Sequence, residues 1–221
     1  MARRVMLSWS SGKDSAWTLA RLRADPSVEC VGLFTTMNQA FDRVAMHAVR
    51  RELLEAQARA AALPLEVIAI PWPCPNDAYE AAMAAFVASA RERGISHFAF
   101  GDLFLEDIRR YRETKLAGSG IEPMFPLWGE PTGALAREMI DGGLRASLTS
   151  IDPKQAPREW AGRAFDRALL AEMPPSVDPC GERGEFHTFA WDGPMFSGPV
   201  GCVGGEVVER DGFVFADLLP A

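Results

Sequence analysis

Short apolar runs alternate with longer amphipathic segments through the first half of the chain. The apolar runs have the length of strands and lie at residues 5–7, 28–35, 65–70 and 97–100. The segments between them repeat apolar positions with the helical period and lie at residues 15–23, 44–62 and 77–93. Strands and helices that alternate in this order predict an α/β fold, in which right-handed crossovers build a doubly wound parallel sheet.

The pattern changes after residue 101. We expect a charged segment, a Pro-flanked run, a short helix, a strand and an amphipathic helix, at residues 106–115, 123–128, 132–140, 144–151 and 157–173. Two Asp-Gly pairs, at residues 192–193 and 211–212, lie between apolar runs and predict turns between strands. This mixture predicts a smaller α+β C-terminal lobe, so that the chain divides into residues 1–125 and 126–221.

The composition indicates a folded protein outside the membrane. With 221 residues and 48% hydrophobic content, the chain can bury a sizeable core. No stretch approaches the roughly 20 apolar residues of a membrane span, and the first residues lead into a strand rather than a cleavable signal. The four cysteines, Cys30, Cys74, Cys180 and Cys202, lie far apart, which favours reduced thiols. We therefore expect a cytoplasmic location.

The charge of the chain argues against a nucleic-acid partner. The formal net charge is -7 and the isoelectric point is about 5.1, whereas nucleic-acid binding usually requires a basic face. The chain is rich in Ala, Arg, Gly and Pro, whose codons are GC-rich, and this indicates a bacterial gene.

A turn of small and polar residues connects the first apolar run to the first helical segment: Ser10, Ser11, Gly12, Lys13, Asp14 and Ser15. A helix that begins here presents unpaired backbone N–H groups and a partial positive charge, and Ser and Gly let an anion approach the main chain. The turn is not a Walker A motif, because Asp14 follows the lysine where that motif has Ser or Thr. It predicts a phosphate site with Lys13 facing solvent; the alternative is a serine-rich N-cap with an exposed lysine.

A second polar segment lies at residues 178–189. It contains Glu182, Glu185 and His187 in a glycine-broken loop that continues into an apolar run. In extended geometry Glu185 and His187 point to the same side, so a carboxylate and a general base would face one space. The alternative is a solvated turn that leads into a hairpin.

Both segments resemble motifs of one enzyme family. The first turn is similar to the SGGKDS loop of the N-type ATP pyrophosphatases (PP-loop proteins), with Ser11 in place of the first Gly, and the second segment resembles the E-N-G-E-[FY]-H-T signature of the diphthine-ammonia ligase family. Further matches occur at residues 46–47, 52–54, 57–58, 63–65, 101–102, 123–128 and 192–194 and at Glu106, Arg109 and Glu113. The resemblance therefore covers nearly the whole chain.

The resemblance implies a ligase that adenylates a carboxylate with ATP and forms an amide with ammonia, releasing AMP and pyrophosphate. It implies that Ser10, Ser11, Gly12 and Ser15 bind the β- and γ-phosphates and that Lys13 neutralises the leaving pyrophosphate. Asp14 would help to bind Mg²⁺, although an Asp at a helix start is also a common cap. Glu185 and His187 would be catalytic. Free ammonia or a partner must supply the nitrogen, because no glutaminase segment is visible.

The resemblance also implies the residues around the two substrates. Thr35 and His47 would contact the adenosine, and Gly101 and Asp102 would form the opposite wall of the nucleotide crevice. The expected acceptor-binding residues are Glu106, Arg109, Trp128, Glu182, Arg183, Phe186 and Thr188, and the aromatic and acidic side chains among them suit a quaternary ammonium. We also expect a homodimer.

Arg183 departs from the family pattern, which has Asn at this position. An arginine that points into the loop would oppose a quaternary ammonium and suit an anion, so we expect a different, bacterial acceptor unless the side chain turns outward. Two other functions stay open. One is a PP-loop tRNA sulfur-transfer enzyme, which needs a persulfide cysteine and a basic docking surface, and the other is a nucleotide-binding protein that lacks catalysis.

Overall fold

A five-stranded parallel sheet forms the centre of the first half of the protein. The computed structural model describes residues 2–38, 43–44 and 49–221. The parallel strands, in spatial order, are β4 (Leu65–Ile70), β2 (Val28–Asn38), β1 (Arg3–Ser8), β5 (His97–Ala99) and β6 (Glu122–Met124). A short β3 (Arg43–Val44) pairs antiparallel with the end of β2. The predicted α/β fold with a doubly wound parallel sheet is confirmed.

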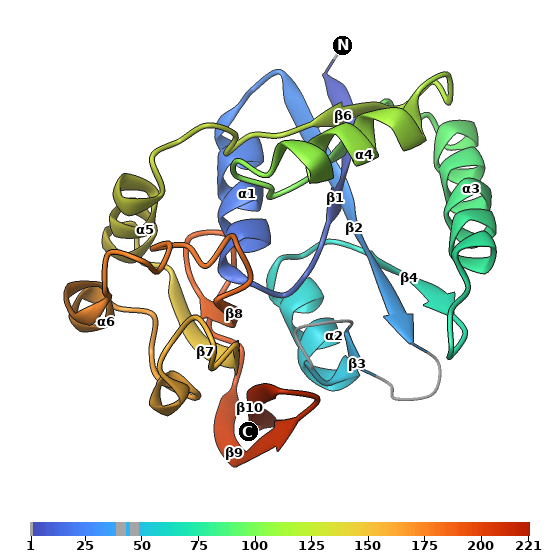
Figure 1. Cartoon of the computed structure of the whole chain (residues 1–221). Coiled ribbons are helices and arrows are strands. Elements are labelled where there is room, and N and C mark those ends of the chain that lie inside the picture. Colours follow the sequence, from blue (N-terminus) through green and yellow to red (C-terminus); the bar gives the residue numbers. More distant parts are fainter. Residues whose placement is uncertain (1, 39–42, 45–48) are drawn as a thin grey trace.

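Four helices cover the two faces of this sheet (Figure 1): α1 (Lys13–Ala24), α2 (Arg51–Ala60), α3 (Asn76–Glu92) and α4 (Glu106–Leu116). Side chains alternate between the faces of a strand. Val5 and Leu7 accordingly belong to the apolar core that includes α1 and α2, and Met6 belongs to the core that includes α3 and α4. The helix that we expected from residue 44 begins at Arg51, and the charged segment at 106–115 is the helix α4.

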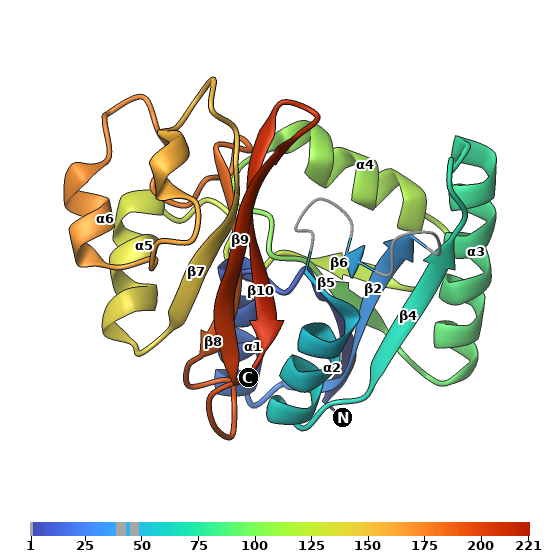
Figure 2. The same ribbon diagram turned by 90° about the horizontal axis from the view of Figure 1, so that it is seen from below.

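The second half forms a smaller α+β lobe, as predicted. Its antiparallel sheet has the order β8 (Phe186–Asp192), β7 (Arg145–Ile151), β10 (Phe213–Pro220) and β9 (Cys202–Arg210). The helices of this lobe are α5 (Thr132–Asp141), the 3-10 turn η1 (Arg158–Trp160) and α6 (Arg167–Glu172). Figure 2 shows this sheet beside α1 and α2, where β8 contacts α1 and β10 contacts α2. One continuous apolar core joins the two halves on this side.

One prediction about the second half is wrong. The expected helix at residues 157–173 is broken into η1 and α6, because Gly162 has φ +83° and the next residues pair with β7, where Phe165 N donates to Ala146 O. The Asp-Gly pair at 192–193 leads into a turn between β8 and β9, in which Phe196 N donates to Gly193 O at 3.0 Å, but the two strands do not form a hairpin, because β8 pairs with β7. The pair at 211–212 does connect two paired strands, β9 and β10.

Two structural findings bear on the remaining predictions. The last strand of the parallel sheet ends at Met124, beside the predicted boundary at residue 125, and that boundary stays a prediction. Among the described helices, none has both the length and the apolar character that a membrane span requires.

Candidate functional site

The two segments singled out in the sequence meet at one pocket of about 340 Å³, which we call the loop pocket. It lies at the carboxyl ends of β1 and β5, where ligands of doubly wound sheets bind. The predicted residues that line it are Ser10, Lys13, Asp14, Ser15, Gly101, Asp102, Glu182, Phe186, His187 and Thr188. The lining also includes Cys180 and Gly181 of the second segment, together with residues that the sequence did not single out for the site: Ser8, Phe100, Leu105, Ile108 and Arg112.

Lys13 is buried, so the expectation that it faces solvent is wrong. Its Nζ lies 2.9 and 2.8 Å from the two carboxylate oxygens of Asp14, and it also donates to the backbone carbonyl of Cys180. The ammonium lies 5.6 Å from the ring centres of Phe165 and Phe186. Burial lowers the pKa of Lys13, but the combined attraction of Asp14, Cys180 and Glu182, with Asp14 contributing most, outweighs it and raises this pKa. Lys13 is therefore a charged residue that ties the loop to the second segment.

The backbone of the loop is held in a strained conformation. Ser11 has φ 70°, which is unfavourable for a residue other than Gly, and its buried hydroxyl has no hydrogen-bond partner among the described residues. Its carbonyl accepts hydrogen bonds from Ala190 N (2.9 Å) and from the side-chain amide of Gln57 (3.0 Å). Gln57 also accepts from the Trp9 indole at 2.9 Å. No role was predicted for Gln57, although a glutamine on the apolar stripe of α2, beside Leu53 and Leu54, indicates a buried polar contact.

Contacts with two other segments fix the start of α1. The backbone N–H of Lys13 donates to Thr188 Oγ1 at 3.0 Å, so Thr188, which we expected to bind the acceptor, caps the helix. A Cβ on Gly101 would lie 3.0 Å from the backbone carbon of Asp14 and 3.1 Å from Ser15 N. A glycine at residue 101 thus lets the chain after β5 approach the loop closely, and a larger residue would require a shift of a few tenths of an ångström.

Two buried carboxylates shape the loop at residues 178–185. Asp178 accepts hydrogen bonds from Cys180 N (2.9 Å) and from the Thr132 hydroxyl (2.7 Å). Glu185 accepts from Asp178 N (2.9 Å) and Arg183 N (3.0 Å), and it is only 1% exposed. The expectation that Glu185 shares one space with His187 is therefore wrong. The carboxylate of Glu185 binds backbone N–H groups inside the turn and does not line the pocket, whereas His187 does.

Several titratable groups that line the pocket, Glu182 and His187 among them, have shifted pKa values. Burial raises the pKa of Glu182 to about 7, although its Oε1 accepts a hydrogen bond from Leu103 N at 2.8 Å. Burial and the nearby charge of Lys13 lower the pKa of His187 to about 4, so the imidazole is neutral at physiological pH. Asp102 forms a bidentate ion pair with Arg112, at 2.5 and 3.0 Å. The pocket thus holds a neutral imidazole and a carboxyl that titrates near pH 7.

Several predicted residues lie away from this pocket. Thr35 lies inside β2 instead of after it, because the pairing with β4 extends to Asn38. The guanidinium of Arg109 lies 4.8 Å from the ring centre of Trp128. A cation of the protein itself therefore occupies the aromatic face that we expected to bind a substrate cation. Arg109 is also paired with Glu113, and Glu106 is exposed in the first turn of α4. His47 lies outside the described residues.

Arg183 is exposed and lies 5.5 Å from the ring centre of Phe104, outside the lining of the loop pocket. The side chain turns outward, which removes the charge argument against a quaternary ammonium. Cys180 lines the pocket, but burial raises the pKa of its thiol, so the thiolate is disfavoured.

Comparisons with known proteins match both halves of the chain. A model of the diphthamide synthase C-terminal domain matches residues 131–211, which include the segment 178–189. The diphthine--ammonia ligase of Rattus norvegicus is 26% identical over 237 residues, which cover 97% of this chain and 88% of the relative. The Homo sapiens protein of that name is 25% identical with the same coverage, and that of Schizosaccharomyces pombe is 28% identical over 41% of this chain and 16% of its own length.

The chain is similar to the diphthine--ammonia ligases along nearly its whole length. The alignments with the rat and human relatives run through both halves of the structure, so the loop at 10–15 and the segment at 178–189 both fall within them. The resemblance inferred from the two motifs is confirmed.

Proposed function

We propose that this protein is an ATP-dependent ligase, which adenylates a carboxylate and forms an amide with ammonia, releasing AMP and pyrophosphate. The observation that carries the proposal is the convergence of the 10–15 loop and the 178–189 segment in one pocket, with the buried ammonium of Lys13 between them. Relatives named diphthine--ammonia ligase support the reaction class.

In the first step, a carboxylate oxygen of the acceptor attacks the α-phosphorus of ATP, and the bond between the α- and β-phosphates breaks. Negative charge then grows on the departing pyrophosphate. The start of α1 and the ammonium of Lys13 provide positive potential at this place. Ser10 and Ser15, whose hydroxyls lie 3.1 Å apart, supply hydrogen-bonding groups to the phosphates, and Ser11 and Gly12 shape the main chain around them. Gly101 and Asp102 form the opposite wall of the pocket. The contacts of Thr35 and His47 with the adenosine remain predictions, and His47 lies outside the residues that the structure describes.

In the second step, ammonia attacks the acyl carbon, AMP leaves, and the new amide nitrogen must lose a proton. Glu182 is suited to accept it, because a carboxyl with a pKa of about 7 is partly ionised at physiological pH. The neutral imidazole of His187 is a second acceptor in the same pocket. Glu185 acts in this proposal by holding the loop, and Phe186 contributes an aromatic face against the acceptor.

The pocket fits a magnesium ion that is bound mainly through the phosphates of ATP. Among the described residues, no group of three or more His, Cys, Asp or Glu side chains could hold a metal ion. Mg²⁺ commonly takes one or two protein carboxylates together with substrate phosphates, and the carboxylate of Asp14 lines the pocket. Asp14 would hold the ion, which when bound neutralises phosphate charge. Lys13 would then exchange part of its pairing with Asp14 for the phosphates.

The acceptor in this proposal is a carboxylate. Because Arg183 lies outside the lining of the loop pocket, its charge does not oppose an acceptor that also carries a quaternary ammonium. Glu106, Arg109 and Trp128 also lie outside it and stay predictions for a larger acceptor that extends along α4. The raised pKa of Cys180 disfavours a persulfide mechanism, which weakens the tRNA sulfur-transfer alternative. A cytoplasmic location and a homodimer stay predictions; the exposed edge strand β9, with Val203 and Val207, is the surface we would test for the dimer.

Product analysis tests the reaction. The purified protein is incubated with ATP, magnesium, ammonium and a panel of carboxylates, and the nucleotides are separated by chromatography. We expect AMP and pyrophosphate, and hydroxylamine in place of ammonium should trap the acyl-adenylate as a hydroxamate. ADP and phosphate as the main products would contradict the proposal, as would AMP formation that gives neither amide nor hydroxamate with any carboxylate that stimulates it.

A further inference from the structure

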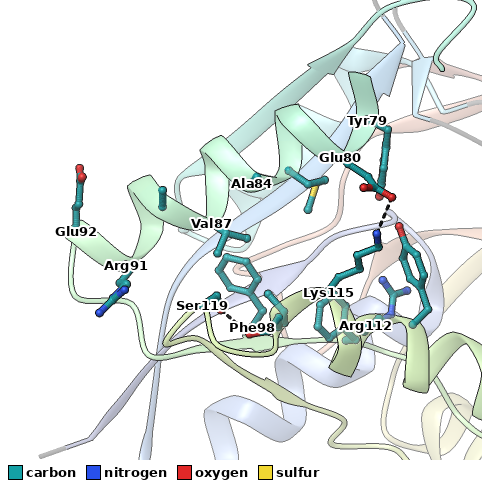
Figure 3. A pocket seen from close by; sticks show the side chains of 15 residues that line it. Tyr79, Glu80, Ala84, Val87, Arg91, Glu92, Phe98, Arg112, Lys115 and Ser119 are labelled. Carbon is teal, nitrogen blue, oxygen red and sulfur yellow. Dashed lines mark hydrogen bonds and ion pairs between the residues drawn. The ribbon is translucent and has the colours of Figure 1, made fainter. Parts of the chain in front are cut away.

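A second cavity, of about 680 Å³, lies between α3 and α4 (Figure 3), and we call it the helix groove. Its floor is apolar and aromatic, with Phe98 from β5 and Phe100 just after it. Met83 and Val87 of α3 and Leu116 of α4 form the walls. The helix groove has twice the volume of the loop pocket, and no step of the proposed reaction uses it.

Charged groups lie at the rim of the helix groove. Lys115 of α4 reaches across to Glu80 of α3, with 2.6 Å between Nζ and Oε1, as Figure 3 shows. Both side chains are about half exposed, so a ligand can replace this ion pair at low cost. The guanidinium of Arg112 lies over the Phe100 ring, 4.2 Å from its centre, beside the same end of the groove. Arg91 adds a third cation to the lining.

The size and lining of the helix groove match a small-molecule site. Such sites usually measure about 300–1,000 Å³ and combine an apolar body with a few polar groups that orient the ligand. Three cations, Arg91, Arg112 and Lys115, line the groove against two acids, Glu80 and Glu92. We propose that the helix groove is a second ligand site, which binds a small amphipathic carboxylate with its apolar body against Met83, Val87 and the edge of Phe100 and its carboxylate at Lys115 and Arg112.

This site is connected to the loop pocket through a shared wall. Phe100 and Arg112 line both cavities, and Arg112 holds Asp102, which lines the loop pocket. A ligand carboxylate at Arg112 shares the guanidinium with Asp102 and so changes the electrostatic potential in the loop pocket. Occupancy of the helix groove therefore changes the affinity for ATP, and by linkage ATP changes the affinity for the groove ligand.

Filling the groove tests the site. The probe is 8-anilinonaphthalene-1-sulfonate, an aromatic anion whose fluorescence rises on apolar surfaces, and the competitor is octanoate. Ala84 lines the groove, whereas Ala85, its exposed neighbour on α3, does not. Ala84→Trp should weaken probe binding and octanoate competition by about tenfold or more, and the matched control Ala85→Trp should change both less than about twofold. Equal affinity in the two variants, with both folded by thermal melting, would overturn the site.

The charge of the ligand is tested separately. Octylamine has the apolar chain of octanoate with the opposite charge, and it should compete much more weakly in the wild-type protein. Glu80→Gln releases Lys115 and should tighten octanoate binding by about twofold to fivefold, whereas Lys115→Gln should weaken it by a similar factor. Equal competition by the amine and the carboxylate would overturn the assignment of an anion.

The connection has its own measurement. Saturating octanoate should change the affinity for a non-hydrolysable ATP analogue in the wild-type protein and in Ala85→Trp, but not in Ala84→Trp. An unchanged affinity in the wild-type protein would overturn the coupling while leaving the site itself to the probe titrations.

Discussion

The loop pocket and the helix groove differ in where they keep their charges. The loop pocket is half as large, yet it holds the buried ammonium of Lys13 and two shifted titratable groups, Glu182 and His187. The helix groove is larger, but its ion pair, Lys115 with Glu80, lies at the exposed rim. The volume of the helix groove reflects only the space between α3 and α4. Buried charge is the better indication of chemistry, because the folded protein must pair or hydrogen-bond every such group.

The two ion pairs also differ in what they contribute. An exposed pair is worth about 0–1 kcal/mol, because water and salt screen it. A buried pair contributes little as a whole, but the removal of one partner leaves an uncompensated charge. The comparison therefore predicts that variants of the loop pocket affect both activity and stability, whereas rim variants of the helix groove leave stability nearly unchanged.

The largest effect is expected for Lys13→Met. The rate of pyrophosphate release should fall by about a hundredfold to a thousandfold, because a group that stabilises the leaving charge is lost. The free energy of unfolding should also fall, by about 3–5 kcal/mol, since Asp14 is left without its partner. Kinetics and urea denaturation measure the two effects.

Two controls sharpen this test. The double variant Lys13→Met with Asp14→Asn should recover much of the lost stability and none of the activity. Lys115→Met, at the rim of the helix groove, should change the free energy of unfolding by less than about 1 kcal/mol. Wild-type stability in Lys13→Met alone would show that the ammonium is not a buried partner of Asp14.

The pH profile is expected to show the next largest effect. Glu182 can accept a proton only when it is ionised, so amide formation at a fixed concentration of free ammonia should rise with pH through about 7 and then level off. Glu182→Gln should lack this limb and be about a hundredfold slower at pH 8. Stability responds in the opposite sense, because a raised carboxyl pKa means that ionisation costs stability as the pH rises from about 4.5 to 7.

His187 provides the comparison for the stability measurement. Its lowered pKa means that the unfolded chain binds the proton more readily, so its contribution to stability is lost as the pH falls from 6.5 towards 4. Glu182→Gln should therefore be more stable than the wild-type protein at pH 8, and His187→Gln should reduce the loss of stability between pH 6.5 and 4. A pH–rate limb that persists in Glu182→Gln would assign the proton to another group.

A smaller effect is expected for Gly101→Ala. The added Cβ would lie 3.0 Å from the backbone carbon of Asp14, so the loop or the end of β5 must shift by a few tenths of an ångström. We expect activity to fall by about tenfold, because misplaced catalytic groups slow the reaction steeply. Gly198→Ala is the matched control, since a Cβ there would have no neighbour within 4 Å. Unchanged activity in Gly101→Ala would show that the close approach of Gly101 does not position the loop for catalysis.

The smallest effect is expected for Ser11→Gly. Glycine relieves the unfavourable φ of 70° and removes a buried hydroxyl that has no hydrogen-bond partner among the described residues. The gain is partly offset by the greater freedom of glycine in the unfolded chain, so we expect a net stabilisation of about 1 kcal/mol. Ala62→Gly, with φ 51° at the end of α2, measures the same backbone effect away from the pocket. Destabilisation by Ser11→Gly alone would mean that the serine makes a contact that stabilises the loop.

Part of the site could be predicted from the sequence, because that part depends on the pattern of residues close along the chain. The alternation of apolar runs with helical segments predicts the parallel sheet, since each strand and helix shows its own period. The placement of the 10–15 turn between a strand and a helix predicts an anion site at the carboxyl edge. The same pattern failed at residues 157–173, where Gly162 and pairing with β7 outweigh the helical period.

The amino-acid sequence by itself determined the class of fold, the phosphate-type loop and the second polar segment, because each depends on residues that are close along the chain. The tertiary structure decided which side chains share a space. Lys13 is buried against Asp14 and the carbonyl of Cys180, and Glu185 lies outside the lining of the loop pocket. Arg183 points outward, and Arg109 covers the ring of Trp128. Those outcomes depend on contacts between residues far apart in the sequence, and no local period or motif encodes the distance between two such side chains.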